Sequence, residues 1–261
     1  MAGYVRPKKS LGQHFLTDTD IARRIAATVM EYKGLPVLEV GPGTGMLTQF
    51  LLNDGHDLKV VELDRESVGY LKKNYPQLNG RIIEGDFLEM NLSDIYNDKF
   101  CLIGNYPYNI SSQIFFKVLD YKDHIPCCSG MIQKEVAERL AAGPGSKIYG
   151  ILSILIQAWY DVEYLFTVSE DVFNPPPKVK SAVIRMTRNK VTILGCDEVL
   201  FKRIVKTAFN QRRKTMRNSL KGILIPGADI LSDNIFNMRP EQISVAQFVK
   251  LTGDLEKYIV Q

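Results

Sequence analysis

A short apolar-rich segment, Val37–Val40, leads directly into three glycines at alternate positions, Gly41, Gly43 and Gly45. A helix-like segment, residues 46–52, follows them. Glycine is used where the chain turns sharply and where a ligand comes close to the backbone. The pattern therefore predicts a strand, a tight turn and a helix that together open a nucleotide-type binding site.

The spacing of these glycines differs from that of a dehydrogenase. Dinucleotide-binding proteins carry Gly-x-Gly-x-x-Gly, in which the turn cradles a pyrophosphate. This chain has Gly-x-Gly-x-Gly instead, so the pyrophosphate cradle is not matched. A ligand with a ribose and no pyrophosphate fits the turn better.

Polar side chains stand where each of the next expected strands ends. In the second strand, residues 58–63, Glu62 lies about 20 positions after the first glycine, the offset at which a carboxylate binds both ribose hydroxyls. The third strand, residues 81–84, is followed by Asp86, whose carboxylate can accept a hydrogen bond from an adenine amino group. The fourth strand, residues 100–104, leads into Asn105, Tyr106, Pro107 and Tyr108. This ordered set is a stronger signal than the glycine turn alone.

The alternation of strands and helices continues to about residue 187. Further strands are expected at 129–132, 162–168 and 181–187, and helical patterns separate most of the strands. Such alternation is typical of an α/β fold with a mainly parallel, doubly wound sheet. The last two strands have no helix between them, which predicts an antiparallel hairpin at one edge. Ligands of such sheets bind beyond the carboxyl ends of the strands, where the four motifs converge.

A triple proline, residues 175–177, makes the connection between these last two strands rigid. It could be only a stiff connector. We favour a functional interpretation, in which Phe173 offers a stacking face to a base and Lys178 and Lys180 contact phosphates.

From residue 189 onward the pattern is helical only. Between Val199 and Gly222 there are eight basic residues and no acidic one, and we expect a basic helix over residues 199–220. A solvated helix face is the plain alternative, but a surface of one sign and this density is typical of phosphate binding. At 261 residues the chain is long enough for an α/β core and a small second domain. We therefore expect an α/β catalytic domain over 1–188 and a small all-helical, basic C-terminal domain over 189–261.

Composition excludes several other classes of protein. The apolar run 148–160 is too short to cross a bilayer and is expected to be a buried core helix. Residues 1–10 carry no apolar stretch typical of a secretory signal, so we expect a cytoplasmic protein. The four cysteines show no C-x-x-C spacing and the three histidines are scattered, so neither a metal site nor a disulfide framework is expected.

Four segments carry a resemblance to a known family. They are 10–16 (Ser-Leu-Gly-Gln-His-Phe-Leu), 105–111 (Asn-Tyr-Pro-Tyr-Asn-Ile-Ser), 174–181 (Asn-Pro-Pro-Pro-Lys-Val-Lys-Ser) and 209–220 (Phe-Asn-Gln-Arg-Arg-Lys-Thr-Met-Arg-Asn-Ser-Leu). Over nearly its whole length the chain resembles bacterial KsgA-type ribosomal RNA adenine dimethyltransferases. One departure is Tyr106, where the family more often has Leu; a change in pocket shape is the consequence to look for.

The resemblance implies a Rossmann-like S-adenosylmethionine-dependent methyltransferase that transfers methyl groups to N6 of two adjacent adenines near the 3′ end of small-subunit (16S) ribosomal RNA. It implies immature small ribosomal subunits as the partner and a monomer. The implied cofactor-binding residues are His14, Leu16, Gly41, Gly43, Glu62, Leu63, Asp86, Phe87 and Asn105. The implied catalytic residues are Asn105, Tyr106, Pro107, Tyr108 and Phe173. The implied RNA-binding residues are Lys178, Lys180, Lys206, Arg212, Arg213, Lys214 and Arg217.

The chemistry explains these residue types. An adenine amino group is a poor nucleophile because its lone pair is delocalised into the ring. The side-chain oxygen of Asn105 and the carbonyl of Tyr106 can hold both amino hydrogens and favour a pyramidal nitrogen. Tyr108 and Phe173 would stack on the base.

Two other classes of function remain open at this point. One is another adenine methyltransferase, either a large-subunit ribosomal RNA enzyme of the antibiotic-resistance type or a DNA enzyme. The other is a ribosome-assembly or transcription factor that binds without catalysis. Loss of Glu62 or Asn105 would mark such a factor, and this chain retains both.

Overall fold

The computed structural model describes residues 5–260. Residues 1–4, part of the segment for which no secretory signal is expected, and Gln261 lie outside that range. The chain forms two compact units, the first made of Met1–Ala137 and Asp161–Arg188 and the second of Glu138–Tyr160 and Asn189–Gln261. The second stretch of the first unit ends at Arg188.

Residues 138–160 differ from the expected division, because they were assigned to the catalytic domain and group with the second unit. The reason is packing: α6 (Ile151–Gln157), a helix that lies wholly within this segment, contacts α7 (Glu198–Asn210) and α9 (Val245–Leu255). The apolar run is also not one helix, since β7 begins at Tyr160.

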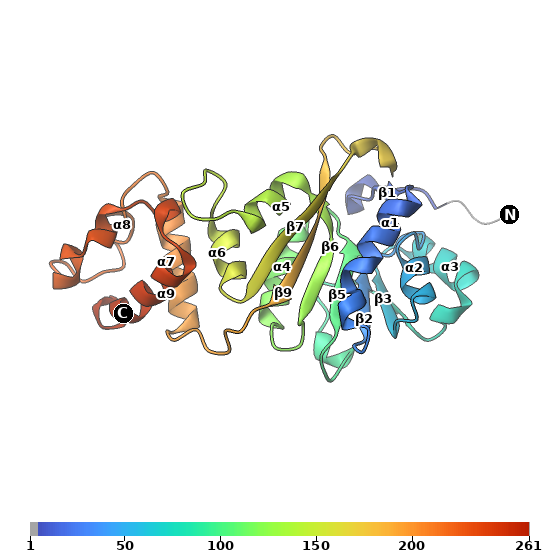
Figure 1. The fold of residues 1–261 in the computed structure, drawn as a ribbon, viewed down its shortest axis with the longest axis horizontal. Helices are drawn as coiled ribbons and strands as arrows, with labels where there is room; N and C mark the ends of the chain where they lie inside the picture. The colour runs from blue at the N-terminus through green and yellow to red at the C-terminus, as the bar shows by residue number, and fades with distance from the viewer. Residues whose placement is uncertain (1–4, 261) are drawn as a thin grey trace. The chain divides into compact units, whose positions relative to one another are not determined.

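The first unit contains a seven-stranded sheet in the order β4-β3-β2-β5-β6-β9-β7. The strands are β2 (Val37–Val40), β3 (Leu58–Glu62), β4 (Ile82–Glu84), β5 (Cys101–Asn105), β6 (Cys127–Gln133), β7 (Tyr160–Val168) and β9 (Ser181–Arg188). The five strands from β4 to β6 are parallel, and β9 is antiparallel to β6 (Figure 1). The predicted α/β fold and the parallel sheet are therefore confirmed, and the last two strands are neighbours at one edge as expected.

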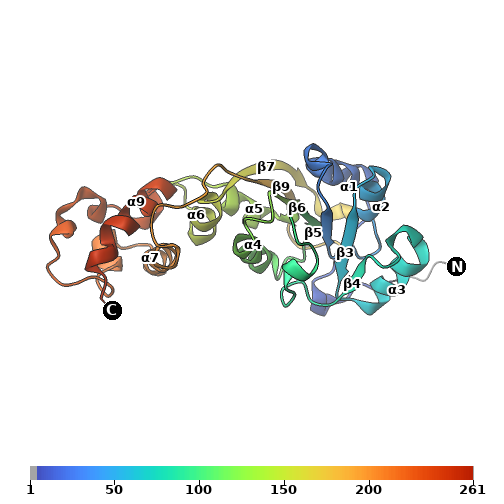
Figure 2. The ribbon, with the colours of Figure 1, turned by 90° about the horizontal axis from the view of Figure 1, so that it is seen from below.

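Helices cover both faces of this sheet. They are α1 (Thr19–Ala26), α2 (Thr48–Asn53), α3 (Arg65–Asn74), α4 (Ser111–Asp120) and α5 (Lys134–Ala141), the last of which continues into the second unit. Figures 1 and 2 show α1 and α2 on one face and α4 on the other. Two helix starts follow from their caps, because the carboxylates of Asp18 and Asp64 accept hydrogen bonds from the first backbone N–H groups of α1 and α3.

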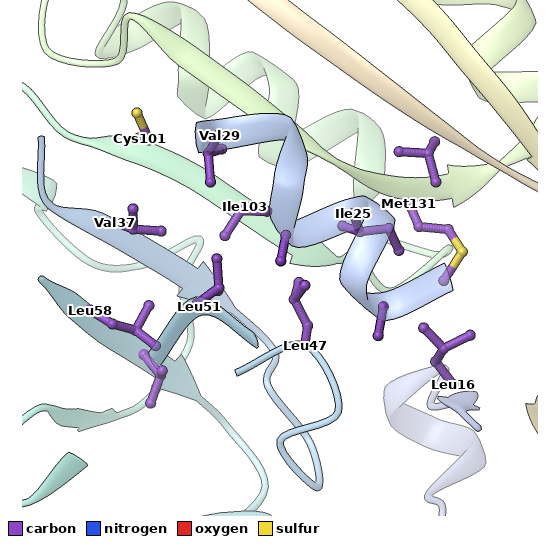
Figure 3. Packing of buried hydrophobic residues seen from close by; sticks show 14 of the residues in the cluster. Leu16, Ile25, Val29, Val37, Leu47, Leu51, Leu58, Cys101, Ile103 and Met131 are labelled. Atoms are coloured by element: carbon purple, nitrogen blue, oxygen red, sulfur yellow. The ribbon is translucent and has the colours of Figure 1, made fainter. Parts of the chain in front are cut away.

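The core of the first unit lies between the sheet and α1 and α2. Figure 3 shows Ile25 of α1 and Leu51 of α2 packed against Val37 and Ile103 of the strands. Side chains alternate along a strand, so the apolar residues face the helices while the strand ends stay available for polar groups. The carboxyl ends of β2, β3 and β5 meet at one edge of the sheet, because these strands are parallel neighbours.

The second unit is helical, as expected. Besides α6, α7 and α9 it contains α8 (Met216–Ser219). The basic run from Val199 is not one continuous helix, however: α7 ends at Asn210 and the chain turns before α8 begins. Arg212, Arg213 and Lys214 therefore lie on a turn. Within residues 5–260 no helix is both long and apolar enough to cross a membrane.

Candidate active site

A cavity of about 240 Å³ lies at the carboxyl ends of β2, β3 and β5. It is lined by most of the site residues that the sequence predicts: His14, Gly41, Gly43, Glu62, Leu63, Asp86, Phe87, Asn105, Tyr106, Pro107 and Tyr108. Residues from the N-terminal segment to β5 thus come together around one space. Of the predicted cofactor-binding and catalytic residues, Leu16 and Phe173 are not among those that line it.

Leu16 and Phe173 pair with each other across a two-stranded sheet. They belong to β1 (Phe15–Leu16) and β8 (Phe173–Asn174), which run antiparallel. Both side chains are buried in the apolar core of the first unit. Leu16 also borders a smaller hollow of about 30 Å³ beside the glycine turn. The stacking of Phe173 on a base stays a prediction. In this conformation the ring lies in the core, so it would have to leave the core before it could contact a base.

The glycine turn cannot accept larger residues. Gly43 and Gly45 have φ of 56° and 81°. A β-carbon on Gly43 would lie 2.8 Å from the ring of Phe15, and one on Gly45 would lie 2.4 Å from the ring of Tyr75. At Gly41, with φ of 68°, a β-carbon would meet no atom within 4 Å. The backbone of Gly41 is therefore open to a ligand in the cavity.

Glu62 is buried at the cavity wall with a fixed orientation. Its Oε2 accepts a hydrogen bond from the backbone N–H of Gly43 at 2.9 Å, and its Oε1 accepts one from the backbone N–H of Asp64 at 2.8 Å. Burial raises the pKa of Glu62, and these two hydrogen bonds oppose the rise. Each carboxylate oxygen retains a further lone pair for a donor in the cavity.

Three neighbouring residues form the next part of the wall. Oδ1 of Asp86 accepts a hydrogen bond from the backbone N–H of Leu88 at 2.8 Å, which fixes the carboxylate. Phe87 is buried, while Leu63 is 50% exposed although it is a large apolar residue. An exposed leucine at a cavity wall offers an apolar face to a ligand.

Asn105 is held by the N-terminal segment. Its Nδ2 donates a hydrogen bond to the backbone carbonyl of His14 at 3.1 Å. The His14 ring lies 2.7 Å, measured from Nδ1, from the carbonyl of Pro175, and it stacks on Tyr108 with ring centroids 5.5 Å apart. The amide nitrogen is used by His14, whereas the amide oxygen accepts no hydrogen bond from residues 5–260 and is therefore the end of the side chain that a ligand can use.

The Tyr106 side chain does not occupy the cavity. Its hydroxyl donates a hydrogen bond to the carbonyl of Ser129 at 2.8 Å, and its ring packs edge-on against Phe115 of α4. Burial raises the pKa of Tyr106 well above its usual range. Gly104 and Gly130, which are paired on β5 and β6, leave room for the ring. The backbone of Tyr106 therefore remains at the cavity while the larger side chain fills the core.

Glu39 is a buried acidic residue that the sequence reasoning missed. It is 1% exposed in the middle of β2 and borders the smaller hollow beside Gly41. Thr48 Oγ1 donates a hydrogen bond to its Oε2 at 2.7 Å. Burial raises the pKa of Glu39 to about 8. The signal in the sequence was a single carboxylate inside an otherwise apolar strand.

The predicted RNA-binding residues belong to both units. Lys178 and Lys180 are exposed on the triple-proline loop of the first unit, and Lys206, Arg213 and Lys214 are exposed in the second. Arg212 and Arg217 are partly used within the protein, because their guanidinium groups donate hydrogen bonds to the carbonyls of Ser146 and Leu231 at 3.3 and 2.6 Å. Among residues 5–260 no group of three or more His, Cys, Asp and Glu side chains could hold a metal ion.

Comparison with known proteins identifies relatives over nearly the full chain. A family model described as Ribosomal RNA adenine dimethylase matches residues 5–257. Ribosomal RNA small subunit methyltransferase A of Parabacteroides distasonis is 69% identical over 255 residues, which are 98% of this chain and 96% of that protein. The protein of the same name from Bacteroides thetaiotaomicron is 66% identical over 254 residues, 97% of this chain and 95% of the relative.

Solved structures agree in fold. A crystal structure of a dimethyladenosine transferase from Plasmodium falciparum has a TM-score of 0.78 at 23% identity and covers 94% of this chain and 99% of its own. The 23S rRNA methyltransferase ErmE has a TM-score of 0.68 at 24% identity and covers 91% and 99%. These two show the fold, and the family match and the identity to the curated relatives show more: the chain belongs to the ribosomal RNA adenine dimethylase family.

Proposed function

We propose that this protein is an S-adenosylmethionine-dependent methyltransferase that dimethylates N6 of two adjacent adenosines near the 3′ end of small-subunit ribosomal RNA. The observation that carries the proposal is the side chain of Asn105, whose amide nitrogen is held by the His14 carbonyl and whose oxygen is thereby free at the cavity. The two curated relatives, at 69% and 66% identity, are named as small-subunit ribosomal RNA methyltransferases, which supports this substrate.

The cavity suits a donor made of a nucleoside and an amino acid. The carboxylate of Glu62 is oriented by two backbone N–H groups and can accept hydrogen bonds from ribose hydroxyls. Asp86 can accept one from an adenine amino group, and Leu63 and Phe87 supply apolar faces beside it. The open backbone at Gly41 allows close approach. When bound, S-adenosylmethionine supplies an electrophilic methyl group on a sulfonium.

Asn105 and Tyr106 then prepare the nucleophile. The amide oxygen of Asn105 and the backbone carbonyl of Tyr106 accept the two hydrogens of the adenine amino group. This arrangement favours a pyramidal nitrogen, whose lone pair is withdrawn from the ring and can form the new bond to the methyl carbon while the carbon–sulfur bond of the donor breaks and its electron pair stays on sulfur. The nitrogen carries a positive charge after transfer and loses one proton to solvent, so no dedicated base is required.

The aromatic residue Tyr108 positions the base. Its hydroxyl hydrogen-bonds to Ser181 Oγ and its ring stacks with His14, so the ring has a fixed orientation at the cavity. A base that has left its own stack can pack on such a ring. Phe173 would join this contact only if it left the core.

The second unit supplies affinity for RNA. Lys206, Arg213 and Lys214 are exposed cations there, and phosphate contacts of this kind position a nucleic acid without reading its sequence. Lys178 and Lys180 add cations to the first unit.

Methyl incorporation from labelled donor tests the proposal. Immature small ribosomal subunits, mature large subunits and naked small-subunit RNA are compared as substrates at equal concentration. We expect fast incorporation into the small subunit, slower incorporation into naked RNA and background into the large subunit. Preferred labelling of the large subunit, or no labelling of any RNA, would contradict the proposed substrate.

A further inference from the structure

The loop between α5 and α6, residues 143–150, is fixed to the turn that carries the predicted RNA-binding cations. All of these residues belong to the second unit. The loop contains one cation, Lys147, which is exposed. It was not among the residues that the sequence predicts to bind RNA.

Three contacts fix this loop. The backbone N–H of Gly145 donates a hydrogen bond to the carbonyl of Glu241 at 2.7 Å. Nη2 of Arg212 donates one to the carbonyl of Ser146 at 3.3 Å. The buried ring of Tyr149 packs edge-on against Phe209, with ring centroids 6.4 Å apart. The loop is therefore held on both sides of Lys147.

Arg212 is central to this arrangement. Its Nε lies 3.9 Å from Oε2 of Glu241, an oxygen that is buried and accepts no hydrogen bond within residues 5–260. A buried carboxylate oxygen is stabilised by a nearby positive charge, so the guanidinium has a structural task besides its contact with Ser146. A planar guanidinium carries N–H groups that point in several directions, so it can contact Ser146 and Glu241 at once. A lysine ammonium lacks this forked arrangement of donors.

The cations next to these contacts have no such task. Among residues 5–260 the side chains of Lys147, Arg213 and Lys214 make no ion pair or hydrogen bond. An open hollow of about 570 Å³ is lined by residues 209–214. Ser146 and Arg212 share a hydrogen bond. Lys147 directly follows Ser146 in the sequence and Arg213 directly follows Arg212, so both cations lie next to the same contact.

We propose that Lys147, Arg213 and Lys214 form one phosphate-binding surface and that Arg212 is a positioning residue, which holds the 143–150 loop in place so that Lys147 can take part. The partner is the sugar-phosphate backbone of structured RNA. The inference rests on the proposed function, since it concerns how the same RNA substrate is held.

The salt dependence of binding to purified immature small ribosomal subunits tests the surface. Each phosphate contact contributes roughly 0.7 to 0.9 to the slope of log affinity against log salt. We expect Lys147→Gln and Arg213→Gln each to lower the slope by about that amount. Lys99→Gln, the same loss of charge on an exposed loop residue of the first unit, is the matched control and should leave the slope unchanged.

A charge-conserving substitution tests the positioning role. Arg212→Lys keeps the positive charge but loses the fork, so we expect the slope to fall by the contribution of Lys147. Lys147→Gln added to Arg212→Lys should then lower the slope no further. Thermal unfolding and donor titration of each variant verify that the protein is folded. Glu241→Gln, which removes the negative charge beside Arg212, provides a second route to the same coupling.

The inference is overturned if Lys147→Gln leaves the slope unchanged, or if Lys147→Gln lowers it equally whether Arg212 is kept or replaced by lysine. Methyl incorporation by the unmodified protein separates this failure from that of the proposed function. If small subunits are methylated while Lys147 makes no contribution to the slope, only the inference about the surface is wrong.

Discussion

At the scale of single residues, the site depends on side chains whose orientation is set by backbone groups. The His14 carbonyl determines which end of the Asn105 amide faces the cavity, and two N–H groups orient the carboxylate of Glu62. Groups held in this way need little reorganisation when a substrate arrives, which is the basis of electrostatic preorganisation.

Replacing Asn105 by Ala removes the proposed acceptor for the adenine amino group. We expect kcat to fall by about 10²-fold or more, as for loss of one preorganised polar contact, while the donor dissociation constant changes less. Steady-state kinetics and donor calorimetry measure the two effects separately. A variant that loses only substrate or donor affinity would show that Asn105 does not act on the transition state.

Replacing Glu62 by Ala removes the proposed contact with the donor's ribose. Hydrogen bonds to a charged group contribute about 1.5–3 kcal/mol, so donor affinity should fall by roughly 10-fold to 100-fold. Calorimetric titration of the variant with donor decides this. Unchanged affinity would mean that the carboxylate serves only the glycine turn through its hydrogen bond with Gly43.

Glu39 makes stability depend on pH. Burial raises its pKa from 4.5 to about 8, so between these values the folded protein holds a proton that the unfolded chain has released. The free energy of unfolding should therefore fall as pH rises through this window. Glu39→Gln can still accept the hydrogen bond from Thr48 and carries no charge. Between pH 5 and pH 8 the free energy of urea unfolding should therefore fall less for this variant than for the unmodified protein, and the two declines should differ by at least about 1 kcal/mol. Parallel pH curves for the two proteins would contradict this assignment.

At the scale of elements, the strands that carry the site could be predicted well from the sequence. The segments expected at 37–40, 58–63, 81–84 and 100–104 match β2, β3, β4 and β5 within one or two residues. Apolar runs bounded by glycine or by polar residues are strong local signals. The cavity at their carboxyl ends followed from the parallel topology.

Other elements depended on contacts that the sequence does not display. The basic run after Val199 was expected as one helix, but it breaks after Asn210. Phe173 was expected to stack on a base, which stays a prediction, and the pairing of β8 with β1, which the sequence does not display, places its ring in the core in this conformation. Residues 138–160 join the second unit because α6 packs on α7. Each of these outcomes depends on tertiary packing between segments far apart in the sequence.

The contact between β5 and β6 requires small residues. A β-carbon on Gly130, which has φ of 149°, would lie 2.1 Å from the carbonyl oxygen of Gly104 and 2.7 Å from the ring of Tyr106. Gly130→Ala should therefore destabilise the protein by roughly 1–3 kcal/mol or more, as overpacking does. Gly69→Ala is the matched control, because Gly69 lies within α3 with no atom near its β-position, and this change should stabilise by about 0.5–1 kcal/mol. Equal effects of the two variants in urea unfolding would contradict the proposed packing.

At the scale of the whole molecule, the two units divide the work as we propose it. The first contains the cavity, and the second contains Arg213 and Lys214. Contacts to phosphates supply affinity that falls with salt, whereas the cavity determines which atom is methylated. The two properties should therefore respond to different substitutions.

Neutralising Arg213 and Lys214 together should lower the slope of log affinity for small subunits against log salt by about 1.4 to 1.8, which corresponds to the loss of two phosphate contacts. Donor affinity should be unaltered, because neither side chain lines the cavity. Binding assays over a salt series and donor calorimetry measure the two quantities. Loss of donor binding in a variant whose thermal unfolding is unchanged would contradict this division of roles.

The identity of the product tests the central claim most directly. Immature small subunits are incubated with donor and either the unmodified protein or Asn105→Ala, and the ribosomal RNA is then digested and analysed by nucleoside mass spectrometry. We predict N6,N6-dimethyladenosine at two adjacent positions near the 3′ end with the unmodified protein, and at most a trace with the variant in the same time. Methyl groups on another atom or another RNA, or equal dimethylation by the variant, would contradict the account.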